Sequence, residues 1–205
     1  MRDVATREDI KDLILDATDR LLNRYGYKKM TMESLSREVG IGKGTIYLHF
    51  PSKEELVLGH IDRIVYRLLV RLQVIAHGSG SPAVRIREML VTRVLFRFDS
   101  VQHYTESLSD LLAEIRQSLL VHREKHFALE AKVFISVIEE GLTDGWFRTV
   151  DPKDTADSLL AATNSLLPYS LSTGELGKRK ELEKKTRLLA DLLLDGLTKR
   201  NDESP

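Results

Sequence analysis

The chain has 205 residues and a formal net charge of zero, with 31 Lys and Arg residues against 31 Asp and Glu residues. It contains no cysteine, which excludes disulfides, thiolate chemistry and Cys-ligated zinc. No apolar stretch reaches membrane-spanning length and the N-terminus is charged, so the sequence predicts a soluble, cytoplasmic protein without a membrane partner. Leu, Glu, Lys and Arg are abundant while alternating β-branched runs are few, which predicts an all-α fold.

The first predicted helix spans residues 6–24, and Gly26 is expected to end it. Its apolar residues recur with the helical period and predict a single buried stripe, formed by Ile10, Leu13, Ile14, Ala17, Leu21 and Leu22. This helix should lie across the two short helices that follow and complete a three-helix domain.

Two short helices are predicted between Thr31 and Lys53. Thr31 is a good N-cap residue for the first, and Gly40 suits the left-handed position that ends it. The second helix should bury Ile46, and it ends at Pro51, which has no N–H to continue the hydrogen-bond ladder. Two short helices joined by a glycine-containing turn predict a helix-turn-helix.

The charge near this motif differs from that of the whole chain. From Arg20 to Lys53 there are seven Lys or Arg residues and two Glu residues, a local balance of 7 − 2 = +5. A basic surface on a neutral protein is what phosphate binding requires. Core supersecondary structure with no ligand is the alternative, and spacing alone leaves it open.

The stretch from Gly40 to Leu56, GIGKGTIYLHFPSKEEL, resembles the DNA-binding motif of TetR-type transcriptional regulators. The residues that match the family pattern are Thr31, Leu35, Gly40, Gly44, Thr45, Tyr47, His49, Phe50, Lys53 and Leu56. Ser36 departs from it, because the family usually has Ala there. The resemblance covers about the first quarter of the chain and implies double-stranded operator DNA as a partner.

The resemblance and the outward positions of the second helix together give a predicted DNA-contact set: Thr31, Lys43, Gly44, Thr45, Tyr47, His49 and Lys53. Thr31 and Lys53 are expected to hold phosphates at the starts of their helices. Lys43, at the start of the recognition helix, is the candidate for reading guanine acceptors.

The rest of the chain predicts further helices at residues 52–76, 82–98, 105–120, 124–144, 151–167 and from 175 or later to 199. Breaks are expected at residues 99–102 and between 120 and 124, and a Gly/Ser/Pro-rich linker at 78–82. The predicted domains are a helix-turn-helix domain over residues 1–51 and a helical effector-binding and dimerisation domain over 52–205.

The last predicted helix is apolar on more than one face, which favours a homodimer over a deeply buried terminal helix. The resemblance implies that helices within 153–167 and 178–199 form a four-helix dimer interface. The predicted interface residues are Leu159, Leu160, Leu189, Leu193 and Leu197.

Aromatic and polar residues outside the helix-turn-helix suggest a pocket for a small-molecule effector, which the resemblance also implies. The predicted pocket residues are Phe96, His103, Tyr104, Phe127, Phe134, Trp146 and Tyr169. Each of them taken alone is more typical of an ordinary core.

His122 and His126 stand four residues apart in HREKH, a spacing that can place two imidazoles on one metal ion. Glu124 is at the third position, so the metalloprotease order HExxH is absent, and the better interpretation is a solvated helix start. No metal and no cofactor are expected.

These observations predict a dimeric, sequence-specific DNA-binding regulator. The predicted regulator is a repressor that an apolar or amphipathic effector releases from a palindromic operator. Two alternatives stay open. One is a ligand-binding or scaffold protein whose helix-turn-helix does not bind DNA. The other is a small helical enzyme, for which no nucleophile–base pair is visible.

Overall fold

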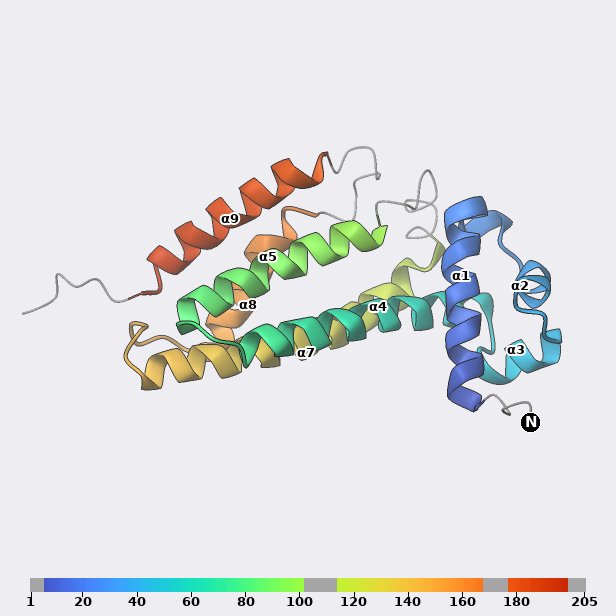
Figure 1. Cartoon of the computed structure of the whole chain (residues 1–205), viewed down its shortest axis with the longest axis horizontal. Helices are drawn as coiled ribbons and strands as arrows, with labels where there is room; N and C mark the ends of the chain where they lie inside the picture. Colours follow the sequence, from blue (N-terminus) through green and yellow to red (C-terminus); the bar gives the residue numbers. More distant parts are fainter. Residues whose placement is uncertain (1–5, 102–113, 168–176, 199–205) are drawn as a thin grey trace, which may run out of the picture.

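The computed structural model describes residues 6–101, 114–167 and 177–198, and in these residues it contains eight helices and a single isolated bridge, between Phe147 and Thr198. The helices are α1 (Arg7–Lys29), α2 (Met32–Val39), α3 (Lys43–His49), α4 (Lys53–Ala76), α5 (Pro82–Val101), α7 (Arg116–Thr143), α8 (Pro152–Asn164) and α9 (Arg179–Asp195). The all-α prediction is confirmed. Figure 1 shows α1, α2 and α3 grouped at one end of an elongated helical body.

The first helix, α1, begins at Thr6, which forms a reciprocal capping box with Asp9. At Gly26 the backbone leaves the helical region, with φ 72°, so α1 is interrupted close to its predicted end and resumes briefly to Lys29. The predicted buried stripe was wrong at Leu13, which is exposed; Leu15 is buried instead.

The predicted ends of the helix-turn-helix are confirmed. Thr31 caps α2 by accepting the Ser34 N–H, and Gly40 ends α2 in the left-handed region at φ 76°. The third helix, α3, ends at His49, two residues before Pro51, and Ser52 then caps α4 by accepting the Glu55 N–H. Leu35 and Ile46 are fully buried, so the two short helices pack through these positions.

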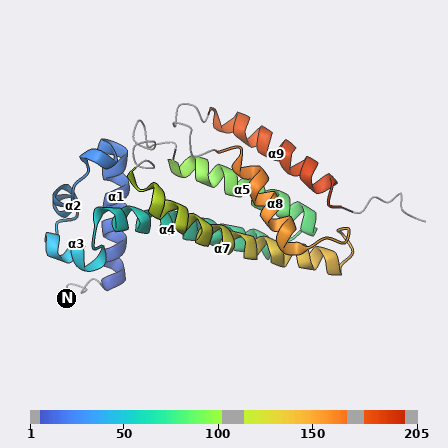
Figure 2. The ribbon, with the colours of Figure 1, turned by 180° about the vertical axis from the view of Figure 1, so that it is seen from behind.

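Two helices take part in both halves of the molecule. The N-terminal core contains Leu56 and Leu58 of α4 and Ile115 at the start of α7, while Leu68 of α4 and Phe134 of α7 belong to the larger core of the C-terminal part. Seen from behind in Figure 2, α4 and α7 run side by side, in agreement with their direct packing. The domain boundary between residues 51 and 52 stays a prediction.

Two predicted breaks were wrong. Helix α5 continues through Val101, and Asp99 accepts two hydrogen bonds from Arg179 of α9, at 2.8 and 3.1 Å. Helix α7 runs without interruption from Arg116 to Thr143, through the break expected between residues 120 and 124. Neither site contains Gly or Pro, so no local feature opposes a helix. The predicted helix 105–120 lies largely outside the described residues.

The end of α7 is packed against the end of α9. The Phe147 ring is buried against Gly141, where an added Cβ would lie 2.2 Å from a ring carbon. The Arg148 N–H donates to the Leu197 carbonyl, at 3.0 Å. Helix α8 begins at Asp151 with Pro152 at its first position, as predicted, and ends earlier than expected, at Asn164.

A charged network lies inside the C-terminal part. Arg93 and Glu130 are both fully buried and ion-paired, and Arg97 binds the second carboxylate oxygen of Glu130, at 2.6 Å. Arg93 also donates to Thr163 and Asn164 of α8. The network therefore joins α5, α7 and α8 through charge-assisted hydrogen bonds.

Candidate nucleic-acid interface

Helix α3 lies at one end of the molecule (Figure 1). Ile46 and Phe50 point into the N-terminal core, whereas Tyr47 is 48% exposed and Leu48 is 76% exposed. Leu48 was not among the predicted contacts because leucine suggests a core residue. Its place two residues from both Ile46 and Phe50 could have revealed its outward direction. A seven-residue helix with exposed, large side chains is suited to contact another molecule.

Gly44 is the second residue of α3, and glycine is a poorer helix former than alanine. A Cβ added at Gly44 would meet no atom of the chain within 4 Å. The packing of the chain itself therefore gives no reason for glycine here. A surface that approaches α3 closely from outside would give one.

Lys43, at the start of α3, forms an ion pair with Glu33 in the first turn of α2. The hydrogen bond from Lys43 lowers the pKa of the exposed Glu33 carboxyl. This pair holds the Lys43 ammonium between the two helices. Because an exposed ion pair contributes little to stability, Lys43 can exchange Glu33 for another anion at little cost. Thr31, by contrast, uses its hydroxyl in the α2 cap, so its contribution to a ligand is the exposed N-terminus of α2.

Lys53 is the first residue of α4, with its ammonium 4.1 Å from the Tyr27 ring centroid. Partial burial lowers the pKa of Lys53, and the nearby Glu114 carboxylate opposes this. A cation at a helix N-terminus is electrostatically unfavourable, because the free N–H groups already carry partial positive charge. An anion bound there would neutralise both, so Lys53 and the α4 terminus form a suitable phosphate site.

The position of α3 depends directly on α4. An added Cβ at Gly59 of α4 would lie 2.7 Å from Cε1 of Phe50, so the absence of a side chain at residue 59 lets the end of α3 pack closely. Thr45 and His49 of α3 are half-buried. Movement of α4 must therefore be transmitted to the exposed residues of α3.

The described members of the predicted pocket set differ in how exposed they are. Phe134 is fully buried in the core and Trp146 is half-exposed at the surface, and their place in a pocket stays a prediction. Phe96 and Phe127 are half-buried, with the guanidinium carbons of Arg71 and Arg93 at 4.7 and 5.4 Å from their respective ring centroids. The other predicted pocket residues, His103, Tyr104 and Tyr169, lie outside the described residues.

The predicted dimer residues point mostly inward. Leu159, Leu160 and Leu197 are buried in the core of the single chain, and Leu189 and Leu193 are half-buried. The single chain already covers the first three, and the interface set as a whole stays a prediction. The outward leucines of α9 are Leu188 and Leu192, which are 61% and 63% exposed.

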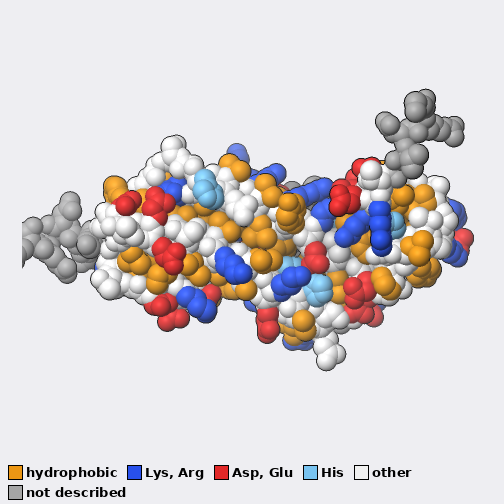
Figure 3. All heavy atoms as spheres, turned by 90° about the horizontal axis from the view of Figure 1, so that it is seen from below, with side chains coloured by type: hydrophobic (Ala, Val, Ile, Leu, Met, Phe, Trp, Pro, Cys, Tyr) orange, Lys and Arg blue, Asp and Glu red, His pale blue; other side chains and the backbone are white. Residues whose placement is uncertain are grey.

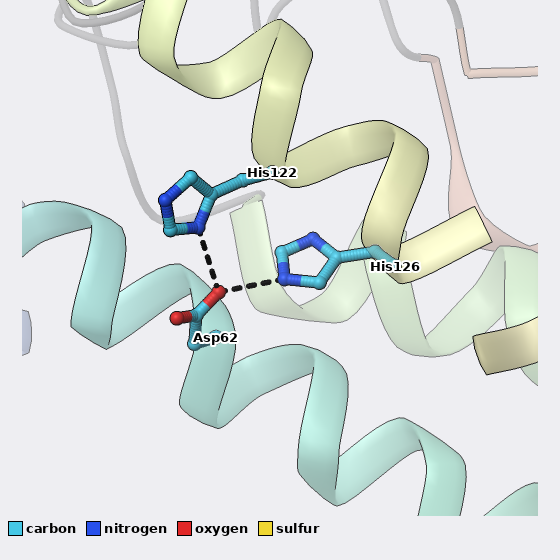
Figure 4. Close-up of side chains that lie close together, drawn as sticks. All are labelled: Asp62, His122 and His126. Atoms are coloured by element: carbon cyan, nitrogen blue, oxygen red, sulfur yellow. Dashed lines mark hydrogen bonds and ion pairs between the residues drawn. The ribbon is translucent and has the colours of Figure 1, made fainter. Parts of the chain in front are cut away.

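The two histidines in HREKH are not at a solvated helix start, so that interpretation was wrong. They lie within α7, where His126 is buried and His122 half-buried, and both rings contact Asp62 of α4. Figure 4 shows the three side chains converging between the two helices.

The rest of the surface is mixed. Figure 3, which shows the molecule from below, has Lys and Arg interspersed with Asp and Glu along this face. None of the helices in the described part of the chain combines the length and the apolar character that a membrane span needs.

The sequence and the fold are similar to those of known regulators. Residues 14–59 match the family model described as "Bacterial regulatory proteins, tetR family". The chain is 32% identical over 159 residues to the uncharacterized HTH-type transcriptional regulator YhgD of Bacillus subtilis, covering 74% of this chain and 79% of YhgD. It is 23% identical over 142 residues to the HTH-type transcriptional repressor KstR2 of Mycobacterium tuberculosis, covering 66% of this chain and 68% of KstR2.

A solved structure with a similar fold is that of a putative TetR-family transcriptional regulator from Mesorhizobium loti. Its TM-score is 0.73 at 17% identity, and the match covers 96% of this chain and 100% of that one. The similarity extends far beyond the matched N-terminal segment and includes the C-terminal helices.

Proposed function

Because the chain belongs to the TetR family of bacterial regulatory proteins, we propose that it is a dimeric repressor that a small molecule releases from a palindromic operator. In general terms the chain is a DNA-binding transcriptional regulator. The members of its family are regulators rather than enzymes. A regulator of this kind acts where the DNA is, so the proposed location is the cytoplasm.

The DNA-binding role is supported most strongly by the surface of α3. Tyr47 and Leu48 project outward, and Gly44 leaves room that no atom of the chain fills. In the proposed complex α3 enters the major groove, where Lys43 exchanges Glu33 for guanine acceptors. Tyr47, Thr45 and His49 contact the groove and its backbone.

Phosphates on either side of the groove would be held at helix termini. Lys53 and the α4 N-terminus bind one, and the α2 N-terminus at Thr31 binds another. Such contacts fix the position of a protein on DNA without reading sequence. Repression, rather than activation, is supported by the similarity to KstR2, whose name identifies it as a repressor.

We propose that two copies pair through the outer face of α8 and α9. Leu188 and Leu192 lie one turn apart on α9 and are exposed in the single chain. Ser158 and Ala161, in the middle of α8, are small and exposed, which allows a second helix to approach closely there. A two-fold dimer would present two α3 helices to the two halves of a palindrome.

The proposed effector is amphipathic rather than purely apolar. Arg93 and Arg97 surround one buried carboxylate, Glu130, and the guanidinium group of Arg93 lies over the Phe127 ring. Two cations around one anion leave local positive charge beside an aromatic surface. A molecule with an apolar chain and an acidic head group matches this combination.

The proposal is tested by incubating the purified chain with genomic fragments, then sequencing and footprinting those that it retains. We expect an enriched near-palindrome with half-site centres roughly 34 Å or more apart. Retention of no fragment above the level of a protein-free control, at any salt concentration, would support the scaffold alternative instead.

A further inference from the structure

Among the described residues, one group of three metal-ligand side chains brings its ligand atoms within 4.8 Å of one another: Asp62, His122 and His126. His126 Nε2 lies 2.6 Å and His122 Nδ1 3.1 Å from the same oxygen, Oδ1 of Asp62. The carboxylate comes from α4 and both imidazoles come from adjacent turns of α7 (Figure 4). Three ligand atoms from two helices therefore converge on one point.

We propose that Asp62, His122 and His126 form a binding site for a divalent transition-metal ion of the zinc type, which clamps α4 to α7. Two imidazole nitrogens and one carboxylate oxygen are a ligand set that Zn²⁺ accepts, at about 2.0–2.2 Å each. A neutral imidazole carries a proton on one ring nitrogen and a free lone pair on the other. His122 can therefore bind a metal ion through Nδ1, and His126 through Nε2, when the proton is on the other nitrogen of each ring.

The geometry needs only a small adjustment. Tetrahedral coordination separates neighbouring ligand atoms by about 3.4 Å, so the carboxylate oxygen must withdraw by roughly 1 Å or less from its present hydrogen-bond distances. The two rings are already steeply inclined, with 72° between their planes and 6.0 Å between their centroids. The three ligand atoms lie within 4.8 Å of one another, so the two imidazole rings must also turn toward each other as the Asp62 side chain rotates.

The environment also suits an exchangeable ion. The His126 side chain is 9% exposed and that of Asp62 is 42% exposed, so the site is anchored in the interior and open on one side. Three protein ligands leave a fourth position for water, as in open rather than closed zinc sites.

The position of the site gives it a consequence for DNA binding, which rests on the proposed function. Asp62 is nine residues, or about 14 Å of helix, from Lys53 at the start of α4. Ile115 of α7 packs in the N-terminal core nearby. An ion here would fix the angle between α4 and α7 just behind the recognition helix, and so change operator affinity.

The test is a Zn²⁺ titration of the chelator-treated full chain, by competition with a chromophoric chelator, for wild type, Asp62→Asn and His122→Gln. Both substituted side chains are partly exposed, so the variants should fold, and circular dichroism checks this. The matched control is His77→Gln, which alters an exposed histidine after α4 whose ring contacts the Gln73 carbonyl.

We expect one Zn²⁺ per chain, an affinity at least tenfold lower in both cluster variants, and unchanged binding in the His77→Gln control. Zn-edge X-ray absorption should show two imidazole ligands, and Zn²⁺ should raise the thermal midpoint of wild type but not of His122→Gln. Equal Zn²⁺ binding by wild type and both cluster variants would overturn the proposal and leave a hydrogen-bonded cluster. The assay contains no DNA, so its failure is distinguishable from failure of the proposed function.

Discussion

Lys53 combines two features that oppose each other in the isolated chain. Its ammonium lies against the Tyr27 ring in a partly buried site, and it stands at the positive end of the α4 dipole. The cation–π contact compensates for some of the lost hydration, since such contacts contribute about 0.5–2 kcal/mol. A bound phosphate would relieve the remaining repulsion.

We therefore predict that Lys53→Ala weakens binding to all DNA sequences alike. It should also reduce the slope of log affinity against log salt by about one unit, since one phosphate contact is lost. Fluorescence anisotropy with operator and random duplexes at several salt concentrations measures both. Lys132→Ala on α7 removes the same charge from an exposed site outside the proposed DNA and dimer surfaces and should change neither quantity. An unaltered slope for Lys53→Ala would remove that residue from the phosphate contacts.

Glu130 is the buried residue with the largest expected effect on stability. Burial acts to raise its pKa, but the charges of Arg97 and Arg93 outweigh this and hold the pKa below its ordinary value of 4.5. A carboxyl group whose pKa is lowered by folding stabilises the native state above about pH 4.5. That contribution declines as the pH falls from 4.5 toward the lower, folded-state pKa.

Glu130→Gln should lower the free energy of unfolding at pH 7 by about 3–5 kcal/mol, because the two arginines lose their shared carboxylate. The variant should also lose less of its remaining stability than wild type on acidification below about pH 4.5. Urea titrations at pH 7 and pH 4, at equal protein concentration, provide the comparison. Glu139→Gln, on the exposed face of the same helix, is the control and should follow wild type. A Glu130→Gln midpoint equal to that of wild type at pH 7 would contradict the role assigned to the network.

At the scale of the elements, local signals predicted the helix-turn-helix well. Thr31, Gly40 and Ser52 act through hydrogen bonds and backbone angles within a few residues, so their effects are readable from the sequence. The continuity of α7 was not readable in this way. Its central turns are held against α4 by contacts such as that between Asp62 and His126, which join residues 64 apart in sequence.

Side-chain direction in the last helices was equally hard to predict. Leucines occupy several faces of α9, and the sequence gives no measure of which face the rest of the chain covers. Packing against α5 buries Leu182 and leaves Leu188 outside. The proposed apolar outer surface of α9 therefore rests on Leu188 and Leu192, which are exposed in the single chain.

Because Leu192 points outward and Leu193 packs inward, substitutions at these two positions of α9 should have different effects. Leu192→Glu should give a folded monomer, because the side chain is exposed in the single chain but buried in the proposed dimer. Leu193→Glu should destabilise the fold itself, since Leu193 packs against the core. Sedimentation gives the mass and circular dichroism the fold. Val74→Glu, at a similarly exposed apolar site on α4, should remain dimeric. A stable dimer of Leu192→Glu would place the interface elsewhere.

At the scale of the whole molecule, the two halves share structural elements and no flexible linker separates them. Helix α4 contributes Leu56 and Leu58 to the N-terminal core and Leu72 and Ala76 to the C-terminal core. Helix α7 repeats this arrangement with Ile115 and Phe134. The ion pairs between Arg63 of α4 and the acidic side of α1 further fix the N-terminal domain to this pair. A change in the angle of α4 must therefore move α3.

We predict that an amphipathic acid binding among α4, α5, α7 and α8 lowers operator affinity by 5- to 150-fold, a coupling of about 1–3 kcal/mol. It can do so only if it binds the state that is incompetent for DNA more tightly than the competent state. Thermodynamic linkage then requires operator DNA to weaken the binding of the acid by the same factor.

Calorimetric titrations of a medium-chain fatty acid into the free protein, into its operator complex and into protein mixed with a scrambled duplex measure both sides of this cycle. The methyl ester of the same acid lacks the charge and should bind more weakly, because it cannot engage the local positive charge of Arg93 and Arg97. Equal affinity of the acid with and without operator would mean that this acid is not an inducer, however tightly it binds.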